Sequence, residues 1–441
     1  MSGELFAEGS LSGAFKTSYS SLLPSTSSCK STSSSGYLSK KTANPTLAVA
    51  SNQPATSSKL RFAFSAASRT PEKSSNLQSI VLDFDRQVPI ERASTPPSSW
   101  YTHPDLLAHE METIFWRSWQ VVGLTCQVEK PHAYFTGSLG KMQYIICRDG
   151  KGELHGFHNV CRHHASPVAS GSGCTTVLQC PYHGWSYSLD GRFQKATRLA
   201  GIQNFKPHDF GLLPISIATW GPFVLLNFSL PCADLKLDHN AVDKDWLGDA
   251  HSAIESADIN AELCHIATKE YLVNCNWKVF CDNYLDGGYH VPIAHKNLAS
   301  GLSLASYSTQ VLERVSIQSC KTDSVAGRLG QSAFYAFVYP NFMINRYGPW
   351  MDTNLVIPLE TSKCLVVFHY FLDPRLVDDK EFVQQSLSES EIVQMEDVVL
   401  CEGVQKGLES PAFSKGRYAP SVETAMHHFH CLLQQDLMST L

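Results

Sequence analysis

Two short pairs of cysteine and histidine constrain this chain more than any other feature of its sequence. Cys161 and His163 form a Cys-x-His pair, and after sixteen intervening residues Cys180 and His183 form a Cys-x-x-His pair. Thiolate and imidazole groups are common protein ligands of zinc and iron. Because both pairs must supply one metal centre, the fold has to bring two separate loops to the same point.

The mixed composition of each pair distinguishes between the possible metals. Structural zinc sites pair Cys with Cys and His with His, at spacings such as C-x2-4-C and H-x3-5-H. Pairs of one cysteine and one histidine suit a two-iron cluster in which two histidines replace two cysteines on one iron, with a potential of about −150 to +300 mV. The sequence therefore predicts that Cys161, His163, Cys180 and His183 hold a Rieske [2Fe–2S] cluster.

The composition excludes several classes of protein. The 441 residues are too many for one ordinary core, so two domains with an appendage are expected. A net charge of −6 gives no support to the binding of nucleic acid, and no apolar run is long enough to span a membrane. The fourteen cysteines are irregularly spaced, which favours reduced thiols over a disulfide framework.

Residues 1–70 differ from the rest of the chain. They contain nineteen serines and several basic residues, with Glu4 and Glu8 as the only acids. A serine-rich, basic and acid-poor leader is typical of an organellar transit peptide, and the lack of an apolar core segment favours the chloroplast over the secretory route. The alternative is a tail that carries no address. We expect cleavage between about residues 60 and 80, and a location in the chloroplast stroma.

The remaining chain divides into three parts by its local patterns. Residues 71–118 predict an N-terminal extension with a helix, residues 119–228 predict a small antiparallel β domain around the four ligands, and residues 229–441 predict a larger catalytic domain. The larger domain begins with a helical or loop connection over 231–260 and ends with two helices. The expected fold class is α+β. The apolar face of the N-terminal helix comprises Leu106, Leu107, Met111, Ile114 and Phe115.

Alternation of apolar and polar residues indicates the individual strands. In the small domain the predicted strands are WQVVGL, AYFTGSL, MQYIICR, LHGFHNV, TTVLQC, WSYSL and GPFVLLNF. In the larger domain they are HIATKEYLV, FYAFVYPNFMINRY, TNLVIPLE and KCLVVFHYFLD. The segment NWKVFCDNYLDGGYHVPIAH predicts a helix that breaks near its end.

Two histidine groups in the larger domain are candidates for a second metal site. His290 and His295 have four residues between them, and such a pair on a helix is more often structural than metal-binding. The chain also ends with a rival histidine cluster that lacks a nearby acid, for which packing or subunit contact is the better interpretation. The rival cluster comprises His427, His428 and His430.

The segments CRHHAS and CPYHGW resemble the Rieske motif of ring-hydroxylating-type oxygenases. Respiratory Rieske proteins carry a further cysteine in each loop, and this chain has Ser166 and Tyr182 at those places. The resemblance implies a second domain of helix-grip (START/Bet v 1-like) fold with an antiparallel sheet. That domain would hold one mononuclear Fe(2+) by two histidines and one carboxylate, with an open face for O2 and substrate.

The same resemblance assigns the iron ligands residue by residue. His290 and His295 match the two histidines, and Asp397 in a late helix matches the carboxylate, with Glu396 as the alternative. The family also has a bridging acid three residues before the first histidine. This chain has Gly287 there and Asp286 one position earlier, and both offsets fall on one helix face, so Asp286 is the expected link between the two metal centres.

A more specific resemblance extends from about residue 80 to the C-terminus. Segments such as TPPSSWYT, NWKVFCDNYLD, YPNF, RYGPW and HHFHC are similar to plant choline monooxygenases, a group within the Rieske oxygenases. The resemblance implies oxidation of choline to betaine aldehyde hydrate, the first step of glycine betaine biosynthesis, with O2 and with reduced ferredoxin as electron donor. It also implies a homo-oligomer, a trimer or dimer, in which electrons cross between subunits.

Other functions stay open at this stage. The substrate is in doubt between choline and another quaternary ammonium compound such as carnitine, and the adjacent Gly287 and Gly288 leave room for a paralogue of low activity. A pure electron carrier would use the cluster alone, but the long segment after the cluster argues against it. Strand alternation places Tyr335, Phe337 and Tyr339 on one side, as a candidate aromatic cage for a cation or as ordinary strand packing.

Overall fold

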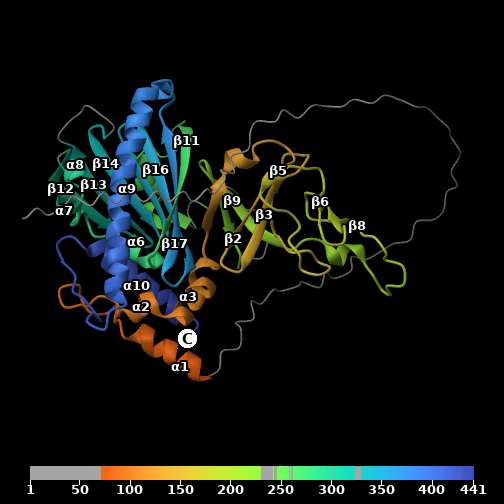
Figure 1. The fold of residues 1–441 in the computed structure, drawn as a ribbon, viewed down its shortest axis with the longest axis horizontal. Coiled ribbons are helices and arrows are strands. Elements are labelled where there is room, and N and C mark those ends of the chain that lie inside the picture. Colours follow the sequence, from red (N-terminus) through yellow and green to blue (C-terminus); the bar gives the residue numbers. More distant parts are fainter. Residues whose placement is uncertain are drawn as a thin grey trace, which may run out of the picture. The chain divides into compact units, whose positions relative to one another are not determined.

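The structure is a computed structural model, and its described part is built around two large β-sheets. It describes residues 71–229, 242, 246–257, 259, 262–299, 301–322 and 329–441. The predicted transit peptide over 1–70 and most of the predicted connection over 231–260 lie outside the described residues. Within the described residues the strands form two seven-stranded sheets and one three-stranded sheet, all with antiparallel pairing (Figure 1).

The first large sheet has the strand order β1-β10-β9-β4-β3-β2-β5. Its strands are β1 (Gln120–Leu124), β2 (Ala133–Leu139), β3 (Met142–Arg148), β4 (Leu154–His158), β5 (Ser172–Cys174), β9 (Pro214–Trp220) and β10 (Phe223–Asn227). The predicted runs AYFTGSL and MQYIICR coincide with β2 and β3. The sequence patterns do not predict β5, which has three exposed residues, or β9, which begins with a proline.

The three-stranded sheet supports the second cysteine–histidine loop. It consists of β6 (Leu178–Gln179), β7 (Ser186–Tyr187) and β8 (Phe193–Lys195). Cys180 and His183 lie in the turn between β6 and β7. Trp185 is buried beneath this turn, where its ring contacts the rings of Phe193, Phe205 and Phe210. This aromatic core gives a short loop with little regular structure a fixed base.

The second large sheet has the strand order β11-β17-β16-β15-β14-β13-β12. Its strands are β11 (Cys264–Val273), β12 (Leu302–Val311), β13 (Val315–Thr322), β14 (Ser332–Val338), β15 (Phe342–Tyr347), β16 (Trp350–Glu360) and β17 (Lys363–Leu372). The four strand runs predicted for this domain fall on β11 and on β14 to β17, while β12 and β13 have no prediction.

Helices pack against the second sheet as the expected helix-grip fold requires. The long helix α9 (Lys380–Leu408) lies in front of the strands in Figure 1 and contacts α6 (Trp277–Tyr284) and β11. The C-terminal helix α10 (Thr424–Met438) contacts β12. The remaining described elements are η2 (Thr125–Val128), η3 (Pro207–Phe210), η5 (Gly248–Ala250), α5 (His251–Ser256), α7 (Val291–Ala294), α8 (Lys296–Ala299) and η6 (Pro374–Leu376).

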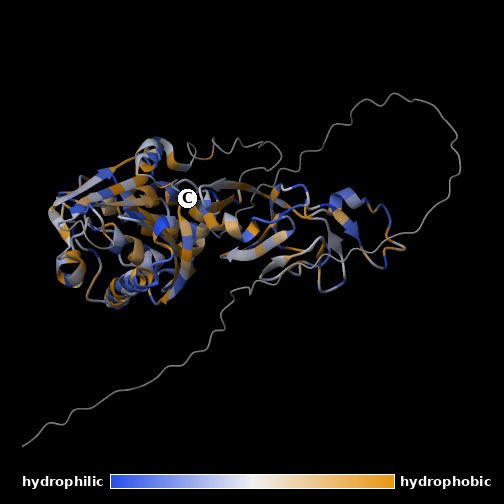
Figure 2. Ribbon diagram, turned by 90° about the horizontal axis from the view of Figure 1, so that it is seen from above, coloured by the Kyte–Doolittle hydropathy of each residue, from blue (hydrophilic) through white to orange (hydrophobic). Residues whose placement is uncertain are grey.

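The N-terminal extension packs against the C-terminal helix. Its elements are α1 (Pro71–Leu82), α2 (Ser99–Thr102), α3 (Pro104–Glu110) and the π-helical turn η1 (Met111–Phe115). Leu106, Ile114 and Phe115 are fully buried, which confirms the predicted apolar face. Because α1 and η1 both contact α10, the two ends of the described chain share one hydrophobic core. Figure 2 shows hydrophobic residues recurring along the strands and helices around this core.

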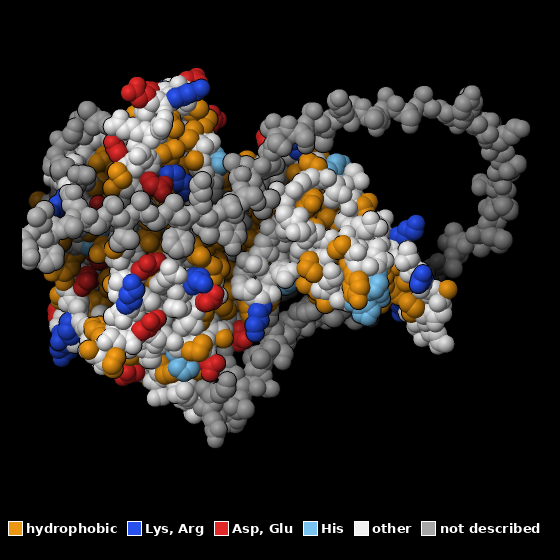
Figure 3. All heavy atoms as spheres, viewed as in Figure 1, with side chains coloured by type: hydrophobic (Ala, Val, Ile, Leu, Met, Phe, Trp, Pro, Cys, Tyr) orange, Lys and Arg blue, Asp and Glu red, His pale blue; other side chains and the backbone are white. Residues whose placement is uncertain are grey.

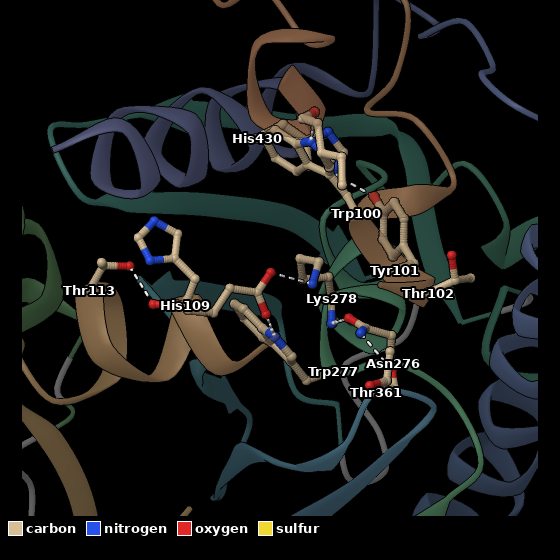
Figure 4. A network of polar contacts seen from close by, with 12 residues as sticks. Trp100, Tyr101, Thr102, His109, Thr113, Asn276, Trp277, Lys278, Thr361 and His430 are labelled. Carbon is tan, nitrogen blue, oxygen red and sulfur yellow. Dashed lines mark hydrogen bonds and ion pairs between the residues drawn. The ribbon is translucent and has the colours of Figure 1, made fainter. Parts of the chain in front are cut away.

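A buried ion pair joins the extension to helix α6. Lys278 of α6 donates to Glu110 of α3 across 2.6 Å, and both side chains are 0% exposed. The other carboxylate oxygen of Glu110 accepts from Trp277 Nε1 at 2.8 Å. Figure 4 shows Lys278 and Trp277 facing α3, with Tyr101 nearby. The Lys278 ammonium also lies 5.5 Å from the centre of the Tyr101 ring, so this charge is compensated on several sides.

The prediction of one helix that carries Asp286 on the same face as His290 is wrong in its geometry. Helix α6 ends at Tyr284, and α7 does not begin until Val291. Gly287 and Gly288 between them have φ angles of 73° and 74°, which a helix cannot contain. Asp286 therefore approaches His290 through a tight turn, not along a helix.

No helix among the described residues combines the length and apolar content that crossing a membrane needs.

Candidate metal centres

The two cysteine–histidine loops have matching backbone structures. In each loop the cysteine N–H donates to the carbonyl five residues later, and the residue four positions later donates back to the cysteine carbonyl. The residue that donates back to the cysteine carbonyl is Ala165 in the first loop, with φ of 59°, and Gly184 in the second loop, with φ of 73°. The four bonds are Cys161–Ser166 at 2.9 Å, Ala165–Cys161 at 3.0 Å, Cys180–Trp185 at 2.8 Å and Gly184–Cys180 at 3.0 Å.

These loops bring the predicted cluster ligands together. The Nδ1 atoms of His163 and His183 lie 3.1 Å apart. Cys161 and Cys180 are 3% and 2% exposed, whereas both imidazoles are exposed. Two inward thiols and two facing imidazole nitrogens, one of each from either loop, are a donor set that fits a [2Fe–2S] cluster with mixed ligands. The exposed imidazoles would form the side through which electrons enter or leave.

Aromatic and hydroxyl groups hold the same side chains in place. The His163 ring stacks on Trp185 with 4.6 Å between ring centres, and Tyr182 stacks on His183 at 3.8 Å. Tyr187 places its hydroxyl 3.2 Å from the Cys161 sulfur. Cys174, which lies outside the predicted pattern, is exposed in β5. The histidine stacking is a feature that ligand spacing alone does not predict.

Three side chains converge in the second domain. Nε2 of His290 and Nε2 of His295 are 3.1 Å apart, and Oδ1 of Asp397 lies 3.5 Å from the first and 3.0 Å from the second. The short helix α7 separates the two histidines, and Asp397 projects from the middle of α9. Among the described residues this trio is one of two groups with geometry suited to a metal ion.

A carboxylate behind each histidine fixes its orientation. His290 Nδ1 contacts Asp286 Oδ2 at 2.6 Å, and His295 Nδ1 contacts Glu396 Oε2 at 2.7 Å. A proton held on Nδ1 leaves the lone pair of each Nε2 directed at the common point. Glu396 and Asp397 are neighbours in sequence, but in this arrangement Asp397 faces the common point while Glu396 lies behind His295.

The charges at this site favour a cation. Burial alone would lower the pKa of His290, but the hydrogen bonds and charges of Asp286 and Asp397 raise it to about 9. Burial alone would raise the pKa of Asp397, but His290 and His295 bring it below its usual value. Asp397 therefore stays ionised beside imidazoles that otherwise gather protons. A divalent metal replaces those protons and satisfies the same negative groups.

The turn that carries Asp286 explains why its position is displaced. Oδ1 of Asp286 accepts from the N–H groups of Gly288 and Tyr289, and Oδ2 accepts from the N–H of His290 as well as from its ring. A side chain at Gly287 would place Cβ 2.1 Å from the carbonyl oxygen of Val422. An acid at position 287 is therefore sterically excluded, and the acid one residue earlier reaches the histidine.

A cavity of about 170 Å³ adjoins the three converging side chains. Its lining residues come from α6, α7, α8, α9, the turn between α6 and α7, and the second sheet. Its size is below the roughly 300–1,000 Å³ of pockets for drug-sized ligands, so it suits a small molecule. Aromatic rings form much of its wall, and aliphatic, carboxylate, amide and imidazole side chains form most of the rest. The aromatic residues are Phe280, Tyr284, Tyr307, Tyr335, Tyr347 and Phe368.

The candidate cage residues and terminal histidines divide between this cavity and the core. Tyr335 lines the cavity, whereas Phe337 and Tyr339 pack against Phe429, with ring centres 5.3 and 6.1 Å apart. His430 is buried, and its nitrogens contact Asp282 and two tyrosine hydroxyls. These contacts support packing over metal binding for His430. Figure 4 shows His430 beside Trp100 and Tyr101.

Comparisons with known proteins agree with this division of the chain. Residues 118–206 match the family described as Rieske [2Fe-2S] domain. Residues 260–439 match the family described as ring hydroxylating alpha subunit (catalytic domain). Together the two matches imply a Rieske [2Fe–2S] cluster and a mononuclear iron as the cofactors of the chain.

Solved structures share the fold at low identity. The quaternary ammonium Rieske monooxygenase CntA, in complex with an inhibitor, has a TM-score of 0.69 at 24% identity over 78% of this chain and 95% of that chain. Naphthalene 1,2-dioxygenase from Rhodococcus sp. has a TM-score of 0.66 at 18% identity over 84% of this chain and 100% of that chain. These structures confirm the expected fold class.

Sequence relatives are closer. Choline monooxygenase, chloroplastic, from Arabidopsis thaliana is 54% identical over 82% of this chain and 87% of its own length. The protein of the same name from Spinacia oleracea is 45% identical over 90% of both chains. The carnitine monooxygenase oxygenase subunit of Escherichia coli (strain K12) is 28% identical over 78% of this chain and 94% of its own length. The chain therefore belongs to the plant choline monooxygenase family of Rieske-type oxygenases.

Proposed function

We propose that this protein oxidises choline to betaine aldehyde hydrate in the chloroplast stroma, with reduced ferredoxin as the electron donor. The reaction consumes choline, O2, two electrons and two protons, and yields the hydrate and one water. The observation that carries the proposal is the convergence of two imidazoles and one carboxylate at the wall of a small aromatic cavity. The names of the chloroplastic relatives and the serine-rich segment over residues 1–70 support the substrate and the location.

The proposed roles of the site residues follow their chemistry. Cys161, His163, Cys180 and His183 hold the [2Fe–2S] cluster. The mononuclear Fe(2+) is held by His290, His295 and Asp397, with an open face toward the cavity. When bound, the mononuclear iron supplies the activation of O2, and the cluster supplies the electrons. The proposed domains are an extension over 71–118, a Rieske domain over 119–228 and a catalytic domain over 229–441.

Choline suits the cavity beside this iron site. Its trimethylammonium group has no hydrogen-bonding atoms, so aromatic rings bind it through cation–π attraction and burial. The hydroxyls of Tyr284 and Tyr307 are engaged by Asn345 and Gln318 at 2.8 and 3.0 Å. Those rings therefore contribute apolar and π surface to the cavity, where a fully methylated cation has most to gain.

Electron transfer between subunits is part of the proposal. Asp286 contacts His290 and is the proposed link to the histidines of a neighbouring cluster. Near it the chain exposes an apolar surface of α7 and α9, in which Ile293 is 79% and Val399 is 68% exposed. A homo-oligomer that covers this surface accounts for its exposure in one chain. Figure 3 shows exposed histidines gathered on the Rieske part, where the cluster loops reach the surface.

A substrate panel tests the function. The purified protein, with ferredoxin, its reductase and NADPH, is expected to convert choline to betaine aldehyde and to convert carnitine more slowly. It should contain about three irons per chain, two in the cluster and one at the mononuclear site. About two irons per chain without O2-dependent product would indicate an electron carrier. Faster turnover of carnitine than of choline would contradict the proposed substrate.

A further inference from the structure

Two buried amide nitrogens on residues of the cavity wall lack hydrogen-bond partners among the described residues. Nδ2 of Asn354 and Nε2 of Gln394 are inaccessible to solvent and contact no acceptor within the described residues, and each residue is 3% exposed. Buried donors without partners are rare in native proteins, because each has lost its water and gained nothing in exchange. Because both residues line one cavity, an occupant of the cavity can supply the missing acceptor once the amide side chain turns toward it.

The surroundings fix the direction of one amide. Oδ1 of Asn354 accepts from Nδ2 of Asn345 at 2.9 Å, and Asn345 also donates to Asp352 at 2.7 Å. Because Asn345 needs an acceptor at this position, the Asn354 amide cannot be turned over. Its N–H groups are therefore directed away from Asn345. The unsatisfied donor is a property of the arrangement and not of an arbitrary assignment of oxygen and nitrogen.

Gln394 lies close to the iron ligands. It precedes Asp397 by three residues on α9, so the two side chains project from the same face of the helix. Both line the cavity. A ligand atom bound by Gln394 therefore lies beside the metal centre, whereas the aromatic rings of Tyr307, Tyr335 and Phe368 extend the wall of the cavity across the sheet.

The chemistry of the substrate determines what these donors can bind. A trimethylammonium group neither donates nor accepts hydrogen bonds, and the alcohol oxygen is the only acceptor in choline. The carbon that bears this oxygen is the one that is oxidised, so it must lie next to the iron. We propose that Gln394 donates to the alcohol oxygen of the substrate and so determines which carbon faces the metal, with Asn354 as a second donor across the cavity. This assignment rests on the proposed function.

Binding of two related cations tests the role of Gln394. Choline and ethyltrimethylammonium share the ammonium head, but only choline has an oxygen. In the iron-loaded enzyme without electron donor, Gln394→Met should raise the Kd of choline about five- to tenfold by calorimetry. The same change should leave the Kd of ethyltrimethylammonium within about twofold. The thermal unfolding temperature should not fall, because Nε2 of Gln394 has no hydrogen-bond partner among the described residues.

Ser390→Ala is the matched control. Ser390 lines the same cavity one turn earlier on α9, but its hydroxyl already contacts Tyr370 at 3.1 Å. This variant should not distinguish the two cations. An equal loss of affinity for both cations in Gln394→Met, or no loss for choline, would overturn the assignment. Wild-type protein that binds and oxidises no choline would instead overturn the proposed function, and the assignment with it.

Discussion

Glu396 and Asp397 are adjacent acids on α9 whose carboxylates lie on different sides of His295. If Asp397 is the iron ligand, Asp397→Ala should lower the iron content from about three to about two per chain while the visible Rieske absorption stays unchanged. Glu396→Gln keeps the three iron ligands but removes the negative charge that orients the His295 ring, so the affinity for iron should fall about 10–100-fold. Iron analysis with a competing chelator measures both effects. Full iron in Asp397→Ala would reverse the two roles.

The proposed role of Asp286, as the link between the two metal centres, depends on its negative charge. In the Asp286→Asn variant one oxygen becomes an amide donor that faces N–H groups, so the turn over Gly287 and Gly288 loses acceptors. Because the His290 ring also loses its anionic partner, reoxidation of the reduced cluster by O2 and choline should slow about 10–100-fold.

Stopped-flow absorption of the cluster measures this rate in the Asp286→Asn variant. Both metal centres should remain loaded when no competing chelator is present, and Asp282→Asn is the matched control, because Asp282 contacts His430 and Tyr101 and not His290. A normal rate in the Asp286 variant would show that another group carries the connection.

Individual residues differ in how far the sequence reveals them. The two cysteine–histidine pairs indicate a cluster because their chemistry and spacing are unusual together. The turn of Asp286 is not foreseeable from helical periodicity, since it depends on contact of Gly287 with the distant Val422 carbonyl. The amides of Asn354 and Gln394 carry no local signal either. Their significance arises only when the fold encloses them beside a cavity.

At the scale of elements, the Glu110–Lys278 pair connects α3 to α6 inside the core. Removal of one partner leaves an uncompensated buried charge, which costs about 3–5 kcal/mol. We therefore expect Lys278→Met to lower the free energy of unfolding by that amount, measured with denaturant. The double variant Glu110→Gln with Lys278→Met should recover most of the loss, because no isolated charge remains.

A half-exposed pair provides the comparison for this buried one. Lys269 contacts Glu391 with 28% and 41% of the side chains exposed, so Lys269→Met should change the free energy of unfolding by at most about 1 kcal/mol. Equal effects of Lys269→Met and Lys278→Met would show that burial of the Glu110–Lys278 pair has no energetic importance.

Strands with long apolar or alternating runs are the ones that the sequence predicts well. β2, β3, β16 and β17 alternate or run apolar because one or both faces are covered. β12 and β13 escape prediction because they carry polar side chains inside the domain. Tyr307 and Gln318, which face the cavity, contact each other from these two strands at 3.0 Å. In these two strands the polar residues that face the cavity therefore interrupt the apolar pattern from which a strand is predicted.

At the scale of the whole molecule, residues around both candidate metal centres are exposed to solvent in a single chain. His163, His183 and Tyr182 are exposed at the cluster loops, and the apolar surface of α7 and α9 is exposed near the iron site. An assembly in which the cluster of one chain meets the iron site of the next would cover both surfaces. Such head-to-tail contacts form a ring when the rotation from one chain to the next closes.

Mixing of two inactive variants tests whether electrons cross between chains. Cys180→Ser removes a proposed cluster ligand, and Asp397→Ala removes a proposed iron ligand, so each homo-oligomer should be inactive with choline. After dissociation and reassembly at equal amounts, transfer between neighbours in a ring should restore about a quarter of wild-type turnover, since that share of contacts joins an intact cluster to an intact iron site. Transfer within one chain predicts no recovery, because no chain then holds both centres. Capture through an affinity tag carried by only one of the two variants confirms that mixed oligomers have formed, and their inactivity would exclude transfer between subunits.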